Sequence, residues 1–168
     1  MKKKSHYRIT ARLLEKMKCA TKKKAILIGS VMPDFLLYTF KRGHYYDTTE
    51  KKVLSSLASL RNKRKWALAD YYRFGYQIHF IEDYFTYVHN FSFLKNAKAH
   101  YAYEVKLQKQ IPSFFRENLP FSPSPLPFED FLRSTHRTYL SLPNSITTDL
   151  FYIVTVVRQL LYSFREKL

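Results

Sequence analysis

The scarcity of helix-breaking residues over long stretches of the chain is the feature that most constrains its fold. Only 3 of the 168 residues are glycine, and five of the 7 prolines fall within residues 112–127. Glycine and proline are the strongest local breakers of regular structure, so their scarcity elsewhere favours long helices. Hydrophobic residues make up 46% of the chain, and its length fits one domain with a real core. The sequence therefore predicts a single all-α domain, residues 1–168, with a proline-rich surface loop at about 112–127.

Apolar residues recur at helical spacing in six segments. The longest, residues 65–91, carries aromatic side chains on most of its faces, which is typical of a central helix in a bundle. Within it, Gly75 costs about 1 kcal/mol relative to alanine, which indicates close approach of another backbone or an ion, or else simple packing. Pro33 disfavours a helical Met32, so Asp34 is expected at a bend. The pattern predicts helices at 6–20, 48–60, 65–91, 97–115, 128–142 and 146–166.

Five of the six histidines stand in one ordered set with carboxylates. The core of the set is His79-x-x-x-Asp83-x-x-x-x-x-His89, followed by His100-x-x-x-Glu104. Residues four apart lie one above the other on a helix, so His79 with Asp83, and His100 with Glu104, can each bind one ion. On one continuous helix, His89 would lie about 80° round from His79, on the same half of the surface. Imidazole with carboxylate is a ligand set that suits zinc, so we expect a site for several metal ions.

Three further candidate ligands precede the core of this set in the chain. They are His6, Asp34 at the end of Gly29-Ser30-Val31-Met32-Pro33-Asp34, and His44 in Arg42-Gly43-His44-Tyr45. The alternative for each is a structural histidine or aspartate whose partners are other protein groups. Glu82 is expected to point elsewhere on its helix, and His136, with no acid at helical spacing, is expected on the surface.

The charge balance of the chain limits its partners. Lysine and arginine number 29 against 13 aspartate and glutamate residues, a formal net charge of +16. A field of this sign attracts nucleic acid or an anionic membrane surface, although it also serves solubility alone. The first lysines are followed by no apolar stretch, so no secretory signal peptide is predicted. The single cysteine, Cys19, excludes an intrachain disulfide and is expected to be at least half-buried. We expect a soluble cytoplasmic protein, with peripheral membrane contact as an extension of that prediction.

The set of candidate ligands resembles the zinc-dependent phospholipase C family, a helical superfamily that also contains zinc-dependent single-strand nucleases. The matching pieces are the early histidine, the turn that ends at Asp34, the Gly-His-Tyr segment, the run from Gly75 to His89, and His100-x-x-x-Glu104. The resemblance covers roughly residues 5–105. It implies a multi-helix bundle of the phospholipase C and zinc nuclease type that holds two or three zinc ions.

The resemblance also implies a ligand set for each ion. His44, His79 and Asp34 would hold the first, and Asp83 would bridge it to the second. The second ion would take His6 and the N-terminal amine of Met1. His89, His100 and Glu104 would hold the third. Secreted relatives expose a processed tryptophan at the N-terminus, whereas this chain has methionine there, so a two-ion site stays open as an alternative.

The implied reaction is hydrolysis of a phosphodiester by a zinc-activated water, with no covalent nucleophile. Asp34 would act as a ligand or as the catalytic base. A glutamate at position 104 favours a phospholipase C acting on phospholipid head groups. The basic surface favours the alternative, a nuclease for single-stranded nucleic acid. A third interpretation is a non-catalytic helical protein stabilised by metal. The sequence leaves the head group or base and the oligomeric state open.

Overall fold

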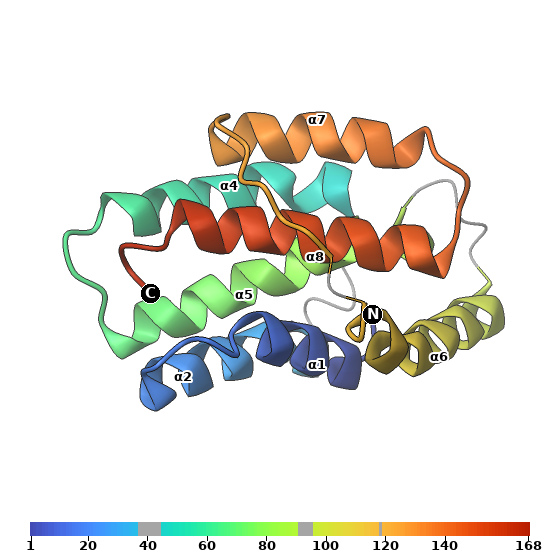
Figure 1. The fold of residues 1–168 in the computed structure, drawn as a ribbon, viewed down its shortest axis with the longest axis horizontal. Coiled ribbons are helices and arrows are strands. Elements are labelled where there is room, and N and C mark those ends of the chain that lie inside the picture. Colours follow the sequence, from blue (N-terminus) through green and yellow to red (C-terminus); the bar gives the residue numbers. More distant parts are fainter. Residues whose placement is uncertain (37–44, 91–95, 118) are drawn as a thin grey trace.

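The computed structural model describes residues 1–36, 45–90, 96–117 and 119–168, and every regular element in these ranges is helical (Figure 1). This confirms the predicted all-α fold. The elements in chain order are α1 (Lys3–Leu13), α2 (Ala20–Val31), the 3₁₀ turn η1 (Met32–Phe35), α4 (Tyr46–Asn62), α5 (Leu68–Tyr84), the 3₁₀ turn η2 (Tyr87–His89), α6 (Ala97–Phe114), α7 (Phe128–Leu140) and α8 (Ile146–Ser163).

Helix α5 is the central element of the bundle. Figure 1 shows it running through the middle, with α4 and α7 on one side and α1 and α2 on the other. It packs against α2, α4 and α8, and every residue from Gln77 to Tyr84 is buried. A helix buried on all faces belongs to the interior, as its aromatic composition predicted. Any polar side chain on this half of α5 is therefore held away from bulk water.

Two glycines bring the backbones of α2 and α5 unusually close. A Cβ at Gly75 would lie 2.0 Å from the carbonyl oxygen of Ile26, and a Cβ at Gly29 would lie 2.1 Å from that of Tyr72. Only a residue without Cβ fits at either point. Glycine is therefore required at position 75 because the backbone of α2 approaches it closely, which is one of the interpretations that its position allowed. The close crossing also brings the end of α2 beside the C-terminal half of α5.

The single predicted helix over 65–91 is wrong at its C-terminal end. Helix α5 stops at Tyr84, and Thr86 is extended (φ −112°, ψ 118°) before η2 carries His89. The Asn90 side chain donates to the carbonyl oxygens of Tyr84 (3.3 Å) and Thr86 (3.0 Å), and the Tyr87 N–H donates to a carboxylate of α8 (2.9 Å). These bonds satisfy the backbone at the helix end, so tertiary contacts override the helical periodicity.

Two expectations that rested on proline are also wrong. Met32 keeps helical angles (φ −62°, ψ −39°) and is the first residue of η1. Pro33 follows it in the first turn, where a missing N–H leaves no bond unmade. Asp34 consequently sits in a 3₁₀ turn that directly continues α2. Pro112 lies inside α6, whose last turn buries Ile111 and Phe114 against the core. The predicted loop at about 112–127 is thus shortened from its N-terminal side.

Two side chains differ in burial from the prediction. His136 is buried, with its Nε2–H facing the carbonyl oxygen of Tyr84 at 3.2 Å and its ring stacked 3.7 Å from that of Tyr46. Helix α7 covers the core here, and sequence spacing within one helix does not reveal such packing. Cys19 is exposed at the start of α2.

Within the described ranges, none of the helices combines the length and hydropathy that crossing a membrane requires.

Candidate metal centre

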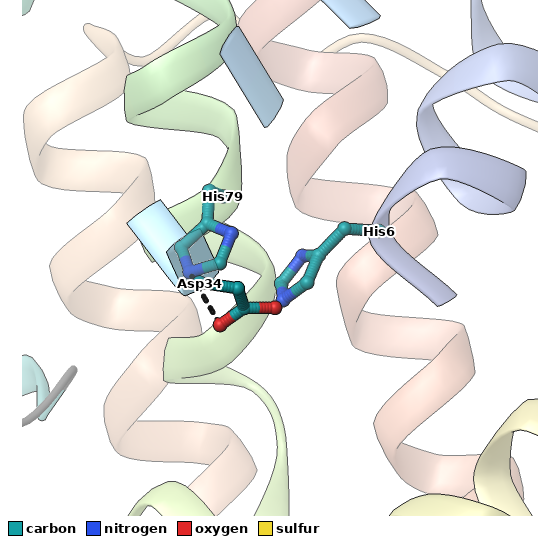
Figure 2. Close-up of side chains that lie close together, drawn as sticks. All are labelled: His6, Asp34 and His79. Carbon is teal, nitrogen blue, oxygen red and sulfur yellow. Dashed lines mark ion pairs between the residues drawn. The ribbon is translucent and has the colours of Figure 1, made fainter. Parts of the chain in front are cut away.

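Three of the candidate ligands meet where α1, η1 and α5 converge. Ligand atoms of His6, Asp34 and His79 all lie within 4.8 Å of one another (Figure 2). The two imidazoles are stacked, with ring centroids 3.9 Å apart, and Asp34 Oδ1 lies 3.8 Å from His79 Nε2. Figure 2 shows the Asp34 carboxylate beside the nitrogen-bearing edges of the two rings, so the three side chains face one small volume. We call this set the inner group.

The hydrogen bonds of the two inner imidazoles direct their Nε2 atoms toward this volume. His79 Nδ1 lies 2.9 Å from the carbonyl oxygen of Ser30. A carbonyl only accepts, so Nδ1 carries the ring proton and Nε2 presents its lone pair. The α2–α5 crossing at the two glycines supplies this carbonyl. His79 is consequently oriented as a ligand by the backbone that packs against its own helix.

Glu82 plays the same part for His6, although it was expected to point elsewhere on its helix. Its Oε2 lies 2.5 Å from His6 Nδ1, and Oε1 accepts a bond from the Thr10 hydroxyl at 3.0 Å. With the shared proton on Nδ1, the lone pair of His6 is on Nε2. That atom is buried and has no hydrogen-bond partner among the described residues. A signal existed in the sequence, since His6 and Thr10 are four apart on α1 and present two polar groups to one buried acid.

The other candidate ligands form a second group at the junction of η2 and α6. Ligand atoms of His89, His100 and Glu104 lie within 4.8 Å of one another. Glu104 Oε1 is 2.9 Å from His100 Nε2 and 3.3 Å from His89 Nε2. The Asn96 side chain caps α6 and so fixes the start of the helix that carries two of the three. We call this set the outer group, because each of its side chains is half-buried whereas the inner imidazoles are fully buried.

Asp83 joins the two groups. Its Oδ1 lies 3.4 Å from His6 Nε2 and 3.7 Å from His89 Nε2, and its Oδ2 lies 3.3 Å from His79 Nε2. The Met1 amine lies 2.5 Å from the same Oδ1. The i, i+4 spacing predicted the pairing of Asp83 with His79. The shape of the bundle adds the contacts to α1 and η2.

The N-terminal amine lies inside the centre. Besides Asp83, it contacts His89 Nε2 at 2.8 Å and Glu104 Oε1 at 3.4 Å. In this arrangement the amine lies with the outer group and His6 with the inner group, whereas the resemblance paired the amine with His6. Seven of the eight predicted ligand side chains thus converge, and the eighth, His44, lies outside the described residues.

The electrostatics of the centre favour bound cations. Burial alone would raise the pKa of Asp83, but the surrounding imidazoles and the amine hold it well below its usual value. Burial opposes charge on the amine, yet Asp83, Glu104 and Asp34 raise its pKa to about 10. Burial lowers the pKa of His89 to about 4 and that of His6 well below its usual value, so both rings are neutral near pH 7. Neutral imidazole and ionised carboxylate are the protonation states in which these groups bind metal.

The donor set fits zinc. It offers imidazole nitrogen and carboxylate oxygen, the two inner imidazoles are held by partners at their other nitrogen, and a buried nitrogen of His6 is left without a hydrogen bond among the described residues. A family model described as zinc dependent phospholipase C matches residues 5–146, which span α1 to α7. No curated protein and no solved structure matches the chain. With the matched model covering most of its length, the chain belongs to the zinc-dependent phospholipase C family.

Proposed function

We propose that the chain is a zinc-dependent phosphodiesterase that releases the phosphorylated head group of a phospholipid. The supporting observation is the convergence of seven nitrogen- and oxygen-bearing side chains from five helical elements, with Asp83 in contact with both groups. Family membership adds the expected metal and the reaction class.

In this proposal, each group of side chains binds one zinc ion, and Asp83 contributes to both. His6, Asp34 and His79 hold the inner ion, and His89, His100 and Glu104 hold the outer ion. The Met1 amine and His44 are the further ligands through which a third ion would be held. To bind a metal, the amine must lose the proton that its raised pKa retains, so its participation depends on competition between the ion and that proton.

Zinc supplies Lewis acidity when bound, which lowers the pKa of a coordinated water to about 7 and neutralises charge on phosphoryl oxygens. The side chains of the protein supply the negative charge of the centre and a proton acceptor. Asp83 and Glu104 keep negative charge in the centre, because their neighbours hold both pKa values below the usual range. Asp34, only partly buried at the rim of the inner group, is placed to accept the proton of the attacking water or to ligate the ion.

Metal analysis and a phosphodiesterase assay together test the proposal. The purified protein should contain two or three zinc ions and should release the phosphorylated head group from phosphatidylcholine, and a chelator should abolish the activity. His79→Ala should lose both metal and activity, whereas Asp34→Asn should lose more activity than metal if Asp34 is the base. Bound zinc without cleavage of any phosphodiester would favour the non-catalytic interpretation. Protein that takes up no zinc even when it is supplied would refute the proposal.

The net charge of +16 supports nuclease activity as a second candidate function. A nuclease of this family would cleave single-stranded DNA or RNA, with binding that weakens steeply as salt rises. Comparing head-group release with oligonucleotide cleavage in the same preparation separates the two.

A further inference from the structure

Two large exposed hydrophobic side chains lie directly beside the metal centre in the chain. Phe35 follows Asp34 of the inner group and is 61% exposed, and Tyr101 follows His100 of the outer group and is 62% exposed. Leu36, next to Phe35, is 42% exposed. Single exposed apolar residues are ordinary, but these flank the two ligands at the more accessible positions of the centre.

Lysines from the N-terminus connect the two sides. Lys2 Nζ lies 3.7 Å from the ring centroid of Tyr101, and Lys3 Nζ lies 3.7 Å from that of Phe35. Because these lysines follow Met1, whose amine is buried in the centre, their stems emerge from the centre itself. We use the name aromatic rim for Lys2, Lys3, Phe35, Leu36 and Tyr101.

The rim combines two properties that suit the surface of an anionic bilayer. Aromatic side chains are favoured at the head-group level of membranes, where the ring is buried and any polar end stays hydrated. Lysines near such a surface are attracted by about 1 kcal/mol each to anionic lipid. Because the ammonium groups lie over the rings, positive charge and aromatic surface are presented together at one place.

We propose that the aromatic rim docks the protein on an anionic phospholipid surface, with the metal centre facing the head groups. This inference rests on the proposed phospholipase function and adds the partner surface. Single-stranded nucleic acid fits the rim less well. Leu36 offers no stacking face, and an ammonium already lies over one face of each ring that a base would use.

Sedimentation with sucrose-loaded vesicles tests the docking. The protein should bind vesicles of equal parts phosphatidylcholine and phosphatidylglycerol more tightly than vesicles of phosphatidylcholine alone. Phe35→Ser with Tyr101→Ser should weaken binding to the mixed vesicles by about tenfold or more. The variant has lost the two aromatic rings that would otherwise move from water into the bilayer on binding. Lys2→Gln with Lys3→Gln should weaken binding to the mixed vesicles by about tenfold or more and leave binding to phosphatidylcholine nearly unchanged. Glutamine at position 2 keeps a bulky residue after Met1, so Met1, whose amine lies in the centre, should still be retained.

Matched controls lie on the other side of the bundle. Leu140 of α7 is 53% exposed, and Lys51 and Lys52 of α4 are exposed, on helices that Figure 1 places away from α1, α2 and α6. Leu140→Ser and the double change Lys51→Gln with Lys52→Gln should bind mixed vesicles as wild type does. If they weaken binding as much as the rim variants, general charge and hydrophobicity explain the attraction and the rim is refuted as a docking site.

A soluble phosphodiester separates this inference from the proposed function. Hydrolysis of a short-chain phospholipid below its micellar concentration should proceed in the rim variants as in wild type. A wild-type protein that cleaves the soluble substrate but binds no vesicle would overturn the docking proposal alone. A protein that cleaves no phosphodiester would overturn the proposed function. Rim variants that lose binding to single-stranded DNA and keep vesicle binding would assign the rim to nucleic acid.

Discussion

Asp149 of α8 ties the outer group to the bundle, and its replacement should have an effect of calculable size. Its Oδ2 accepts the Tyr87 N–H at 2.9 Å and the Tyr103 hydroxyl at 2.8 Å, and its Oδ1 accepts the Tyr139 hydroxyl at 2.8 Å. Tyr87 begins the turn that carries His89, and Tyr103 precedes Glu104. One carboxylate therefore holds both segments that carry the outer group, η2 and α6.

Removing the carboxylate should destabilise the fold strongly. Asp149→Leu leaves three donors without their acceptor, at about 1–3 kcal/mol for each that stays buried, so we expect a total loss of about 3–5 kcal/mol. Zinc affinity of the outer group should fall about tenfold or more, because the bonds of Asp149 to Tyr87 and Tyr103 hold the segments that carry His89 and Glu104. Asp149→Asn should be far milder. Its amide oxygen can accept both bonds made to Oδ2, and its amide N–H can donate to the Tyr139 hydroxyl.

The pH dependence gives a second measure of the same residue. Burial raises the pKa of Asp149 from 3.8 to about 6, against the opposing effect of its donors. A raised carboxyl pKa means that the folded state holds the proton more tightly, so stability is greatest below the unfolded pKa and falls as pH rises toward 6. A shift of 2.2 units corresponds to about 3 kcal/mol. Between about pH 4 and pH 6.5, the free energy of unfolding of wild type should therefore fall by about this amount relative to that of Asp149→Asn.

Urea unfolding at several pH values and zinc titration by competition with a chromophoric chelator measure both effects. Asp130→Asn, an exposed aspartate of α7, is the control and should change neither quantity by much. Equal stability of Asp149→Leu and the control would refute the argument. A stability difference between wild type and Asp149→Asn that does not vary with pH would refute its electrostatic part.

Three further changes test other parts of the structure. Gly75→Ala places a methyl group against the Ile26 carbonyl and should cost about 1–3 kcal/mol in urea unfolding despite the better helix propensity of alanine. His136→Gln should flatten the pH dependence of stability: burial lowers the histidine pKa from 6.5 to about 4, so wild type loses about 3 kcal/mol as pH falls through this range and the variant does not. Glu82→Gln should weaken zinc binding about tenfold or more by competition titration, because the amide holds the His6 ring in place less strongly than the carboxyl group does.

The parts of the centre that could be predicted are those encoded within one helix. His79 with Asp83 and His100 with Glu104 are i, i+4 pairs, and both pairs are close in the structure. The central place of α5 also followed from its composition. These features need only local geometry, which a periodic sequence specifies directly.

The parts that could not be predicted depend on contacts between elements. The end of α5 at Tyr84 is set by the Asn90 side chain and by Asp149 some sixty residues later, which no helical spacing reveals. His136 is buried only because α7 packs over Tyr84. The expectation that Glu82 points away from the site is wrong, because α1 packs over α5 and brings His6 and Thr10 to its carboxyl group. Such relations belong to the assembled bundle, not to any one segment. The predicted cytoplasmic location stays a prediction.

For the proposed phosphodiesterase, the distribution of burial in the centre indicates the side from which a substrate would approach. His6, His79 and Asp83 have fully buried side chains, whereas Asp34 is 18% and His100 33% exposed. Fully buried ligands are held by their second partners and change little when a substrate binds, and the exposed ligands border the surface. A phosphodiester coming from solvent should therefore meet Asp34 and His100 first. Because the next residues along the chain are the rings of the aromatic rim, the same side that admits the phosphate should also be the side that contacts the lipid. Under the two proposals, catalysis and docking use the same side of the protein, and a change at either ring should affect reaction with vesicles while leaving the buried side chains of the centre in place.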